Sequence, residues 1–232
     1  MNQSDIDKIV NYCRNNLDLN EARLADEYCY RSLPLCVIDT IYSIGAHYKS
    51  TELTVKRFCD FFGLERLSMV RYPDPASQLP ISEFLAIYDR FGISEMANRV
   101  FQNRQRTSTR NGILKADAVL RVSQLLHSHA VEYLQDVAKV IENKDFEAEF
   151  RAIPGQTSGI SLRYFYMLVG SDDYVKPDRM IARFIRSATN RDFSVGEMHQ
   201  AIVSAAGVLS SDYPQLTPRL LDNLIWKYQR QI

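Results

Sequence analysis

One segment, residues 152–186, limits the folds open to this chain more than any other. It opens with Ile153-Pro154-Gly155, which a regular helix does not tolerate, because proline lacks an amide donor and glycine permits backbone angles that other residues avoid. The sequence then predicts a helix from near Ser158 that stops before Gly170, since glycine is the commonest residue just past a helix end. After a short loop, Asp178 begins another helix. The segment therefore predicts helix, glycine-containing turn, helix, loop, aspartate, helix.

The rest of the sequence also favours helices. The 232 residues are 46% hydrophobic, which is enough to bury a sizeable core, and no strand-like alternation persists for long. We expect an all-α protein whose helices include residues 20–30, 115–126 and 130–141. No apolar run reaches the length of a membrane span, and the N-terminus is polar and acidic. We therefore expect a cytoplasmic protein without a membrane partner.

The cysteines and histidines show no metal-binding spacing. The four cysteines contain no C-x-x-C pair and stand in apolar, helix-like surroundings, which predicts reduced core residues. His127 and His129 have no carboxylate or cysteine at ligand spacing, so we expect them to lie at a helix end. The cysteines are Cys13, Cys29, Cys36 and Cys59.

Positive charge is concentrated in parts of a chain that is neutral overall. The 28 basic and 28 acidic residues balance, which counts against a general affinity for nucleic acid. Residues 103–112, however, form a basic, hydroxyl-rich loop without an apolar side chain. Arginine and hydroxyl groups are common phosphate ligands, although a solvated loop is the simpler alternative. The candidate phosphate ligands are Arg104, Arg106, Arg110 and, just after the loop, Lys115.

The order of elements in residues 152–186 resembles the helix-hairpin-helix DNA glycosylases, the superfamily that includes endonuclease III and the alkyladenine glycosylases. In that family a hairpin of the type L-P-G-x-G-x-[K/x]-T-A is followed, after one helix, by a catalytic aspartate. Here residues 153–161 match the hairpin and the aspartate falls on Asp178. Thr157 replaces the second hairpin glycine, and Gly159 stands where the bifunctional lyases carry lysine. The resemblance therefore implies a monofunctional, hydrolytic enzyme.

The resemblance also implies an architecture and partners. The fold would be the two-lobed helix-hairpin-helix glycosylase fold, with one lobe at residues 31–170 and a second formed by residues 1–30 and 171–232. The cleft between the lobes would hold a base flipped out of double-stranded DNA. No obligate protein partner is evident. The four-cysteine iron–sulfur loop of some relatives is absent, since no cysteine follows Cys59.

Within this family the hairpin and the aspartate have different tasks. Hairpin amides and small side chains bind the DNA backbone, while the carboxylate stabilises positive charge on the sugar as the N-glycosidic bond breaks. Asp178 is the expected anion, with Asp172 and Asp173 as rivals and an ordinary helix cap as the alternative. No cofactor is expected beyond a monovalent cation, sodium or potassium, on the carbonyls of Arg151, Ile153 and Gln156. The expected DNA contacts of this region are Gly155, Thr157, Gly159, Ser161 and Lys176.

Other residues are candidates for the base pocket or for the wedge that fills the gap in the duplex. Gly45 aligns with the family's gap-filling residue, and glycine cannot fill a gap, so His47 or Tyr48 is the substitute unless both are ordinary loop residues. Leu114 corresponds to the apolar wedge of the family. The tyrosines could equally be core residues. The full candidate set is Tyr42, Gly45, His47, Tyr48, Leu114 and Tyr164.

These residues favour a DNA glycosylase that removes a damaged or modified base and leaves an abasic site. The sequence does not identify the base, and both repair and defence against phages with modified DNA are compatible with it. The alternative is a helix-hairpin-helix protein that binds DNA without breaking a bond. A third possibility is a structural protein that does not contact nucleic acid.

Overall fold

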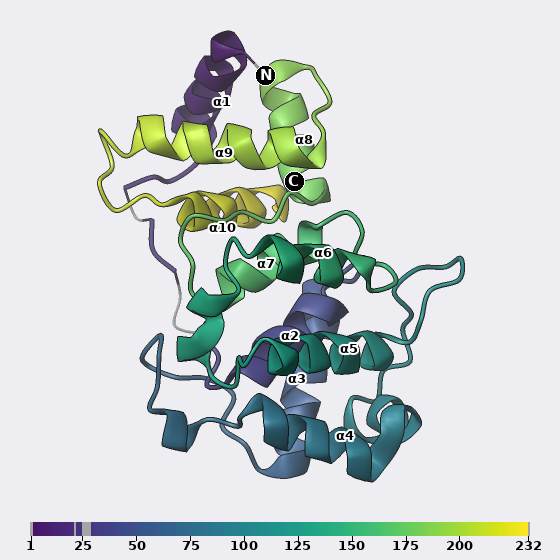
Figure 1. The fold of residues 1–232 in the computed structure, drawn as a ribbon. Coiled ribbons are helices and arrows are strands. Elements are labelled where there is room, and N and C mark those ends of the chain that lie inside the picture. Colours follow the sequence, from purple (N-terminus) through teal and green to yellow (C-terminus); the bar gives the residue numbers. More distant parts are fainter. Residues whose placement is uncertain (1, 21, 25–28, 232) are drawn as a thin grey trace. The chain divides into compact units, whose positions relative to one another are not determined.

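The computed structural model describes residues 2–20, 22–24 and 29–231, and these residues form an all-α protein (Figure 1). Contacts within the chain divide it into two compact units. One unit comprises Met1–Ala25 and Gly170–Ile232, and the other is Asp26–Val169. In the described part of the chain, none of the helices combines the length and apolarity needed to cross a bilayer.

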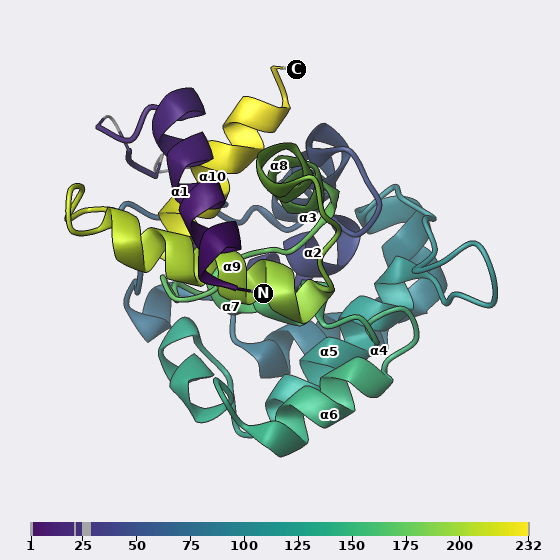
Figure 2. The same cartoon turned by 90° about the horizontal axis from the view of Figure 1, so that it is seen from above.

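The described residues of the unit formed by the two chain ends contain four helices around one apolar core. Helix α1 packs against α8 and α9, and α10 packs against the same two helices (Figures 1 and 2). Side chains such as Ile9, Phe184, Ile202 and Ile225 are fully or almost fully buried in this core. The helices are α1 (Gln3–Asn16), α8 (Arg179–Thr189), α9 (Val195–Leu209) and α10 (Pro218–Gln229).

The second unit is built around one helix, α2 (Leu33–Tyr42), whose ten residues are all buried. It contacts α3, α4, α5 and α7, so most of this unit's core forms around it. Phe58, Phe84 and Phe101 add an aromatic cluster with rings in edge or tilted contact. The other α-helices are α3 (Tyr48–Phe62), α4 (Ile81–Glu95), α5 (Lys115–Ser128), α6 (Lys144–Ala152) and α7 (Ile160–Leu168). Three short elements are η2 (Pro75–Ser77), the π-helical turn η3 (Met96–Val100) and η4 (Leu134–Lys139).

Two of the helices predicted from the sequence do not form in the described residues. Residues 22–24 are not helical, and the rest of the expected helix at 20–30 lies partly outside the described residues. Residues 130–141 contain only the short 3-10 helix η4, because Ala130 adopts a left-handed backbone that ends α5. Val131, Leu134, Val137 and Val140 are buried all the same, which is why their spacing imitated an amphipathic helix.

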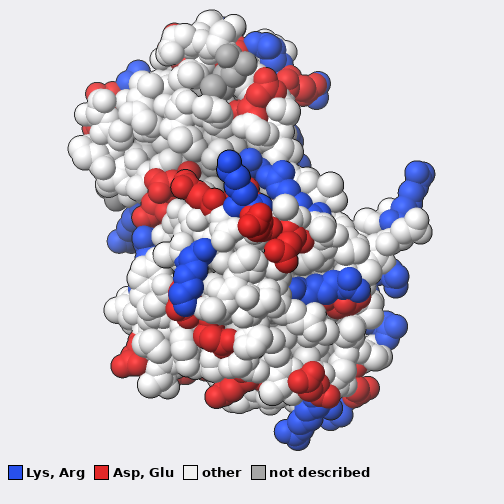
Figure 3. All heavy atoms as spheres, in the orientation of Figure 1, with Lys and Arg blue, Asp and Glu red and all other residues white. Residues whose placement is uncertain are grey.

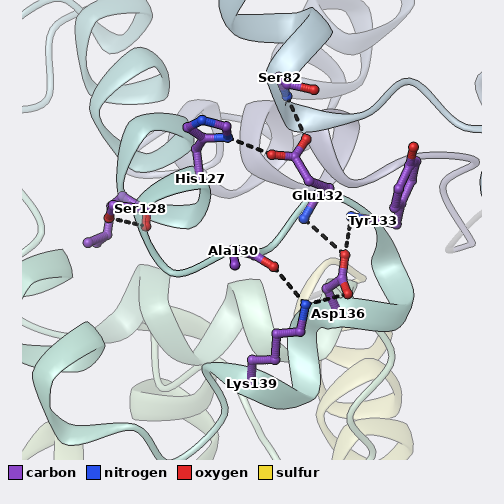
Figure 4. A network of polar contacts seen from close by, with 9 residues as sticks. Ser82, His127, Ser128, Ala130, Glu132, Tyr133, Asp136 and Lys139 are labelled. Carbon is purple, nitrogen blue, oxygen red and sulfur yellow. Dashed lines mark hydrogen bonds and ion pairs between the residues drawn. The ribbon is translucent and has the colours of Figure 1, made fainter.

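A polar network takes the place of the missing helix (Figure 4). The Glu132 carboxylate accepts a hydrogen bond from the Ser82 amide at 2.8 Å. Its other oxygen is hydrogen-bonded to the His127 ring at the end of α5. Asp136 accepts from the amides of Glu132 and Tyr133, both at 3.0 Å. The network joins the start of α4, the end of α5 and η4, and His127 lies at a helix end as its sequence position suggested.

Candidate functional site

The turn between α6 and α7 depends on two glycines with left-handed backbones. Gly155 has φ +90° and Gly159 has φ +73°, values that side-chain-bearing residues adopt only with strain. Gly159 is the residue that begins α7, and a Cβ built on it would lie 2.8 Å from Nη2 of Arg151. The Arg151 guanidinium therefore lies against Gly159, the position where the family that the sequence resembles carries the lyase lysine.

The hairpin exposes some of its backbone and uses the rest internally. Gly155 and Thr157 are exposed, and their amides donate no hydrogen bond within the described structure. The Gly159 amide, in contrast, donates to the Gln156 carbonyl at 3.0 Å. The Ser161 side chain is buried and its hydroxyl donates to Gln156 Oε1, so it is not a phosphate ligand as expected but a part of the hairpin's own framework.

The hairpin packs directly against the basic loop at residues 103–112. A Cβ built on Gly155 would lie 2.5 Å from Cβ of Thr107, so only glycine allows this approach. Thr107 and Gly112 are the buried residues of an otherwise largely exposed loop. Three buried polar atoms of this region have no hydrogen-bond partner within the described residues: Thr107 Oγ1, Gln156 Nε2 and Arg151 Nε. The two elements that the sequence singled out for DNA contact thus form one surface.

The basic loop is held at its base and exposed at its tip. The Thr107 amide donates to Ile113 O at 2.9 Å and the Lys115 amide donates to Gln105 O at 2.8 Å, which closes the loop as a narrow ribbon before α5 (Figure 1). Arg106 Nε donates to Gly112 O at 2.7 Å. Arg104, Arg106 and Arg110 are all exposed and keep donors for an outside acceptor.

Lys115 is not a phosphate ligand, in contrast to the expectation from its position after the basic loop. Its side chain is only 2% exposed. The ammonium donates to the carbonyls of Tyr42 and Ile44 at 3.0 and 2.7 Å and to Gln105 Oε1 at 3.0 Å. Lys115 therefore fixes the base of the basic loop to the end of α2.

The expected base-pocket residues do not form one cluster. Tyr42 is a core residue, buried at 1% exposure against Phe101. Gly45 is exposed with φ +61° and open space around its Cα, and His47 is the exposed residue that begins α3. Leu114 is half-buried beside Arg106, to which it is joined by an isolated β-bridge. Tyr42 is therefore excluded from a pocket, and the others remain candidates.

Tyr164 and Tyr48 belong to a different region of the same unit. Tyr164 donates to Asp39 Oδ1 at 3.1 Å, and the buried Tyr30 donates to Asp39 Oδ2 at 2.7 Å. Burial and the neighbouring Asp39 carboxylate raise the pKa of Tyr30 well above its ordinary value, with Tyr164 and Tyr48 contributing. The cluster thus holds a buried carboxylate satisfied by phenols.

Of the carbonyls expected to hold a cation, those of Arg151, Ile153 and Gln156, two are engaged in the hairpin's own turns. The carbonyls of Ile153 and Gln156 each accept one turn hydrogen bond at 3.0 Å, which leaves each a single lone pair. The Arg151 guanidinium already places a fixed positive charge against the hairpin. In the described residues, no cluster of acidic, histidine or cysteine side chains could supply further ligands. The cation stays a prediction, and no chemistry depends on it.

In the other unit, Asp178 begins α8. Its Oδ1 accepts the Met180 amide at 2.7 Å, the ordinary arrangement of an aspartate that caps a helix. The side chain is half-buried, and its second oxygen accepts no hydrogen bond from the described residues. One oxygen thus fixes the carboxylate, and the other has no hydrogen-bond donor among the described residues. The rival Asp172 lies 3.7 Å from the buried Arg219, whereas Asp173 is exposed.

Two residues of α10 that the sequence analysis did not select hold the loop before Asp178. Asp222 Oδ1 accepts the Lys176 amide at 3.0 Å, and the Arg219 amide donates to Asp172 O at 3.1 Å. Asp222 is only 8% exposed. Burial, followed by the nearby Asp178 charge, raises the pKa of Asp222 to about 8. A sequence signal existed, because Asp222 is a lone acid among apolar positions of its helix.

The outer face of α8 is basic from its first turn. Arg179, Arg183 and Arg186 are exposed and fall on one stripe, opposite the buried Ile181 and Phe184. Only Arg186 pairs with a carboxylate of the described residues, Asp192 at 2.9 Å. Elsewhere, the face drawn in Figure 3 mixes basic and acidic side chains without a large field of one sign.

Comparison with known proteins gives one match. The profile of a family described as a domain of unknown function, DUF8548, matches residues 7–230. Neither a curated protein nor a solved structure matches the chain. The family match covers nearly all of both units.

Proposed function

We propose that this chain, which belongs to the DUF8548 family through its match over residues 7–230, is a monofunctional DNA glycosylase. It hydrolyses the N-glycosidic bond of a damaged or modified base and leaves an abasic site. The observation that carries the proposal is the carboxylate of Asp178 at the start of a basic helix, with one oxygen fixed by the Met180 amide and the other without a hydrogen bond from the described residues. The proposal is also supported by the hairpin at residues 153–161, whose sequence resembles that of the glycosylases and whose turn depends on Gly155 and Gly159.

The proposal gives the residues of the two units different tasks, backbone contacts in one and chemistry in the other. The exposed amides of Gly155 and Thr157, with Arg104, Arg106 and Arg110, bind phosphate groups and read no sequence. The free oxygen of Asp178 stabilises the positive charge that develops on the sugar and orients the attacking water. The flipped base lies beside this carboxylate.

The deciding experiment compares base release by wild type and Asp178→Asn on a panel of damaged and modified duplexes. Asparagine also caps helices, so this variant keeps the bond from Met180 and loses only the charge. We expect base release to fall by roughly 10²–10³-fold, as for other electrostatic groups at a reaction centre. The matched control is Asp173→Asn, an exposed neighbour that should retain activity. Undiminished release by Asp178→Asn would remove Asp178 from the mechanism.

The product should be abasic DNA without strand cleavage. Gly159 offers no amine, and the space beside it is taken by the Arg151 guanidinium, which does not form a Schiff base. Lys176 is the nearest alternative along the chain. Borohydride trapping of a protein–DNA adduct that Lys176→Ala abolishes would show the enzyme to be a lyase.

A second candidate is a protein that binds DNA without cutting a bond. The Asp178 cap favours it, because capping alone accounts for an aspartate at this position. It predicts salt-dependent affinity, lost when Arg104 and Arg106 are replaced by alanine, and no abasic product on any duplex. Absence of DNA binding even at low salt would favour a structural protein instead.

A further inference from the structure

Two residues of helix α10 form hydrogen bonds with the loop that leads to Asp178. The Arg219 amide donates to the carbonyl of Asp172 at 3.1 Å, near the start of the loop. Asp222 Oδ1 accepts the amide of Lys176 at 3.0 Å, two residues before Asp178. The Lys176 carbonyl in turn accepts the Asp178 amide at 2.7 Å. A short chain of hydrogen bonds therefore connects Asp222 to the backbone of the proposed catalytic residue.

The surroundings of Asp222 are unusual for an acid. It is 8% exposed, and no cation of the described residues forms an ion pair with it. The charged groups that face it are Asp178 and Lys176 from the loop and Arg219 from its own helix. Arg219 lies 3.7 Å from the Asp172 carboxylate. A buried carboxyl without a paired cation favours its protonated form.

We infer that Asp222 is a positioning residue for Asp178, a buried neutral carboxyl that holds the 172–178 loop at the Lys176 amide and adds no further negative charge beside Asp178. The inference rests on the proposed role of Asp178. A neutral acceptor is suited to this task, because a second carboxylate beside Asp178 would repel the Asp178 carboxylate. Asp222 itself contacts neither DNA nor the reacting atoms in this role.

The protonation state gives the role a pH signature. Asp222 titrates at about 8, so above that pH it becomes a buried anion next to Asp178. The loop is then held by a group that is itself unfavourably charged. We expect base release by wild type to fall as the pH rises through about 8. Asp222→Asn, which resembles the protonated acid in shape and keeps an acceptor, should remain active with a flat profile over this range.

The loop contact is tested independently of activity by hydrogen exchange of the Lys176 amide, followed by NMR on the full chain. Wild type and Asp222→Asn should protect this amide, whereas Asp222→Leu, which fills a similar volume without an acceptor, should exchange it roughly tenfold faster. A carboxyl titration of wild type followed by ¹³C NMR should place Asp222 near pH 8. Asp212→Asn, an exposed acid after α9, is the control and should change neither quantity.

The outcomes separate the two proposals. If wild type releases a base and Asp222→Asn retains the fall above pH 8, the inference about Asp222 is overturned and the glycosylase stands. Unchanged protection of the Lys176 amide in Asp222→Leu also overturns it. If Asp222→Leu does not fold, the flat pH profile and amide protection of Asp222→Asn decide the matter. If wild type releases no base from any duplex while exchange and titration behave as expected, the glycosylase fails and the catalytic part of the inference fails with it.

Discussion

Single acidic residues in apolar helices are the most informative feature at the residue scale. Asp39 in α2 and Asp222 in α10 both stand among buried hydrophobic neighbours. Asp39 accepts hydrogen bonds from two tyrosine hydroxyls, whereas Asp222 accepts one from a loop amide. A buried acid needs a partner, so each marks a place where a helix holds another segment.

Gly159 gives a prediction at the same scale. Gly159→Ala should lower the free energy of unfolding by about 1–2 kcal/mol, because alanine at φ +73° is strained and its Cβ displaces Arg151. Chemical denaturation measures the change. The control is Gly207→Ala, at an open position of α9, where alanine should stabilise by about 0.5–1 kcal/mol. Equal stability of wild type and Gly159→Ala would show that the hairpin tolerates another backbone.

At the scale of elements, three segments carry exposed hydrogen-bond donors. The hairpin exposes backbone amides, whereas the basic loop and α8 expose arginine side chains. The hairpin and loop meet at Gly155 and Thr107, so the phosphate contacts proposed for them would lie on one surface. Helix α8 lies in the other unit and places its arginines at i, i+4 and i+7, about 6 and 10 Å along the axis. This spacing suits successive phosphates of one strand.

The arginines of α8 can be tested through the salt dependence of DNA binding. Replacing Arg179 and Arg183 by alanine should reduce the slope of log affinity against log salt by about 2, since each phosphate contact contributes about 0.9. Fluorescence anisotropy over a range of salt concentrations measures the slope. Arg14→Ala removes a basic side chain of α1 that already pairs with Asp212, and it should leave the slope unchanged. An unaltered slope in the double variant would exclude α8 from the DNA contact.

At the scale of the whole molecule, the sequence predicted helix ends, which depend on neighbouring residues, better than contacts between residues far apart in the chain. The helix expected to stop before Gly170 ends at Leu168, and Asp178 begins α8 as its position indicated, because glycines and capping residues act on their own neighbours. Lys115 and Asp222 were misjudged or missed, since their partners lie far along the chain. The spacing of residues in the sequence does not show which lysine will be buried as a hydrogen-bond donor to carbonyls far along the chain.

The network at Glu132 gives a prediction for the stability of the whole chain. Burial acts to raise the pKa of Glu132, but hydrogen bonds from Ser82 and His127 outweigh it and leave the pKa below its usual value. Stability from this group is therefore present above the unfolded-state pKa and is lost as the pH falls through the folded-state pKa. Glu132→Gln should lower the free energy of unfolding by about 1 kcal/mol at pH 7, and the difference should vanish in acid.

Thermal unfolding between pH 3 and pH 7 (a range set by the ordinary pKa of glutamate, roughly 4.3) measures this difference. Glu83→Gln, an exposed acid of the first turn of α4, is the control and should shift much less. A difference between wild type and Glu132→Gln that persists at the lowest pH would show that packing, and not the charge, is responsible.

The burial of Asp222 also makes folding a proton-uptake reaction. The pKa of an aspartate in the unfolded chain is roughly 3.9, whereas burial raises the pKa of Asp222 in the folded protein to about 8. Between these values the native state carries a proton that the unfolded state has released, so each rise of one pH unit costs about 1.4 kcal/mol of stability. Near pH 6, calorimetric unfolding should deliver that proton to the buffer. The measured heat should then differ between buffers by their enthalpies of ionisation, and Asp222→Asn should remove the difference.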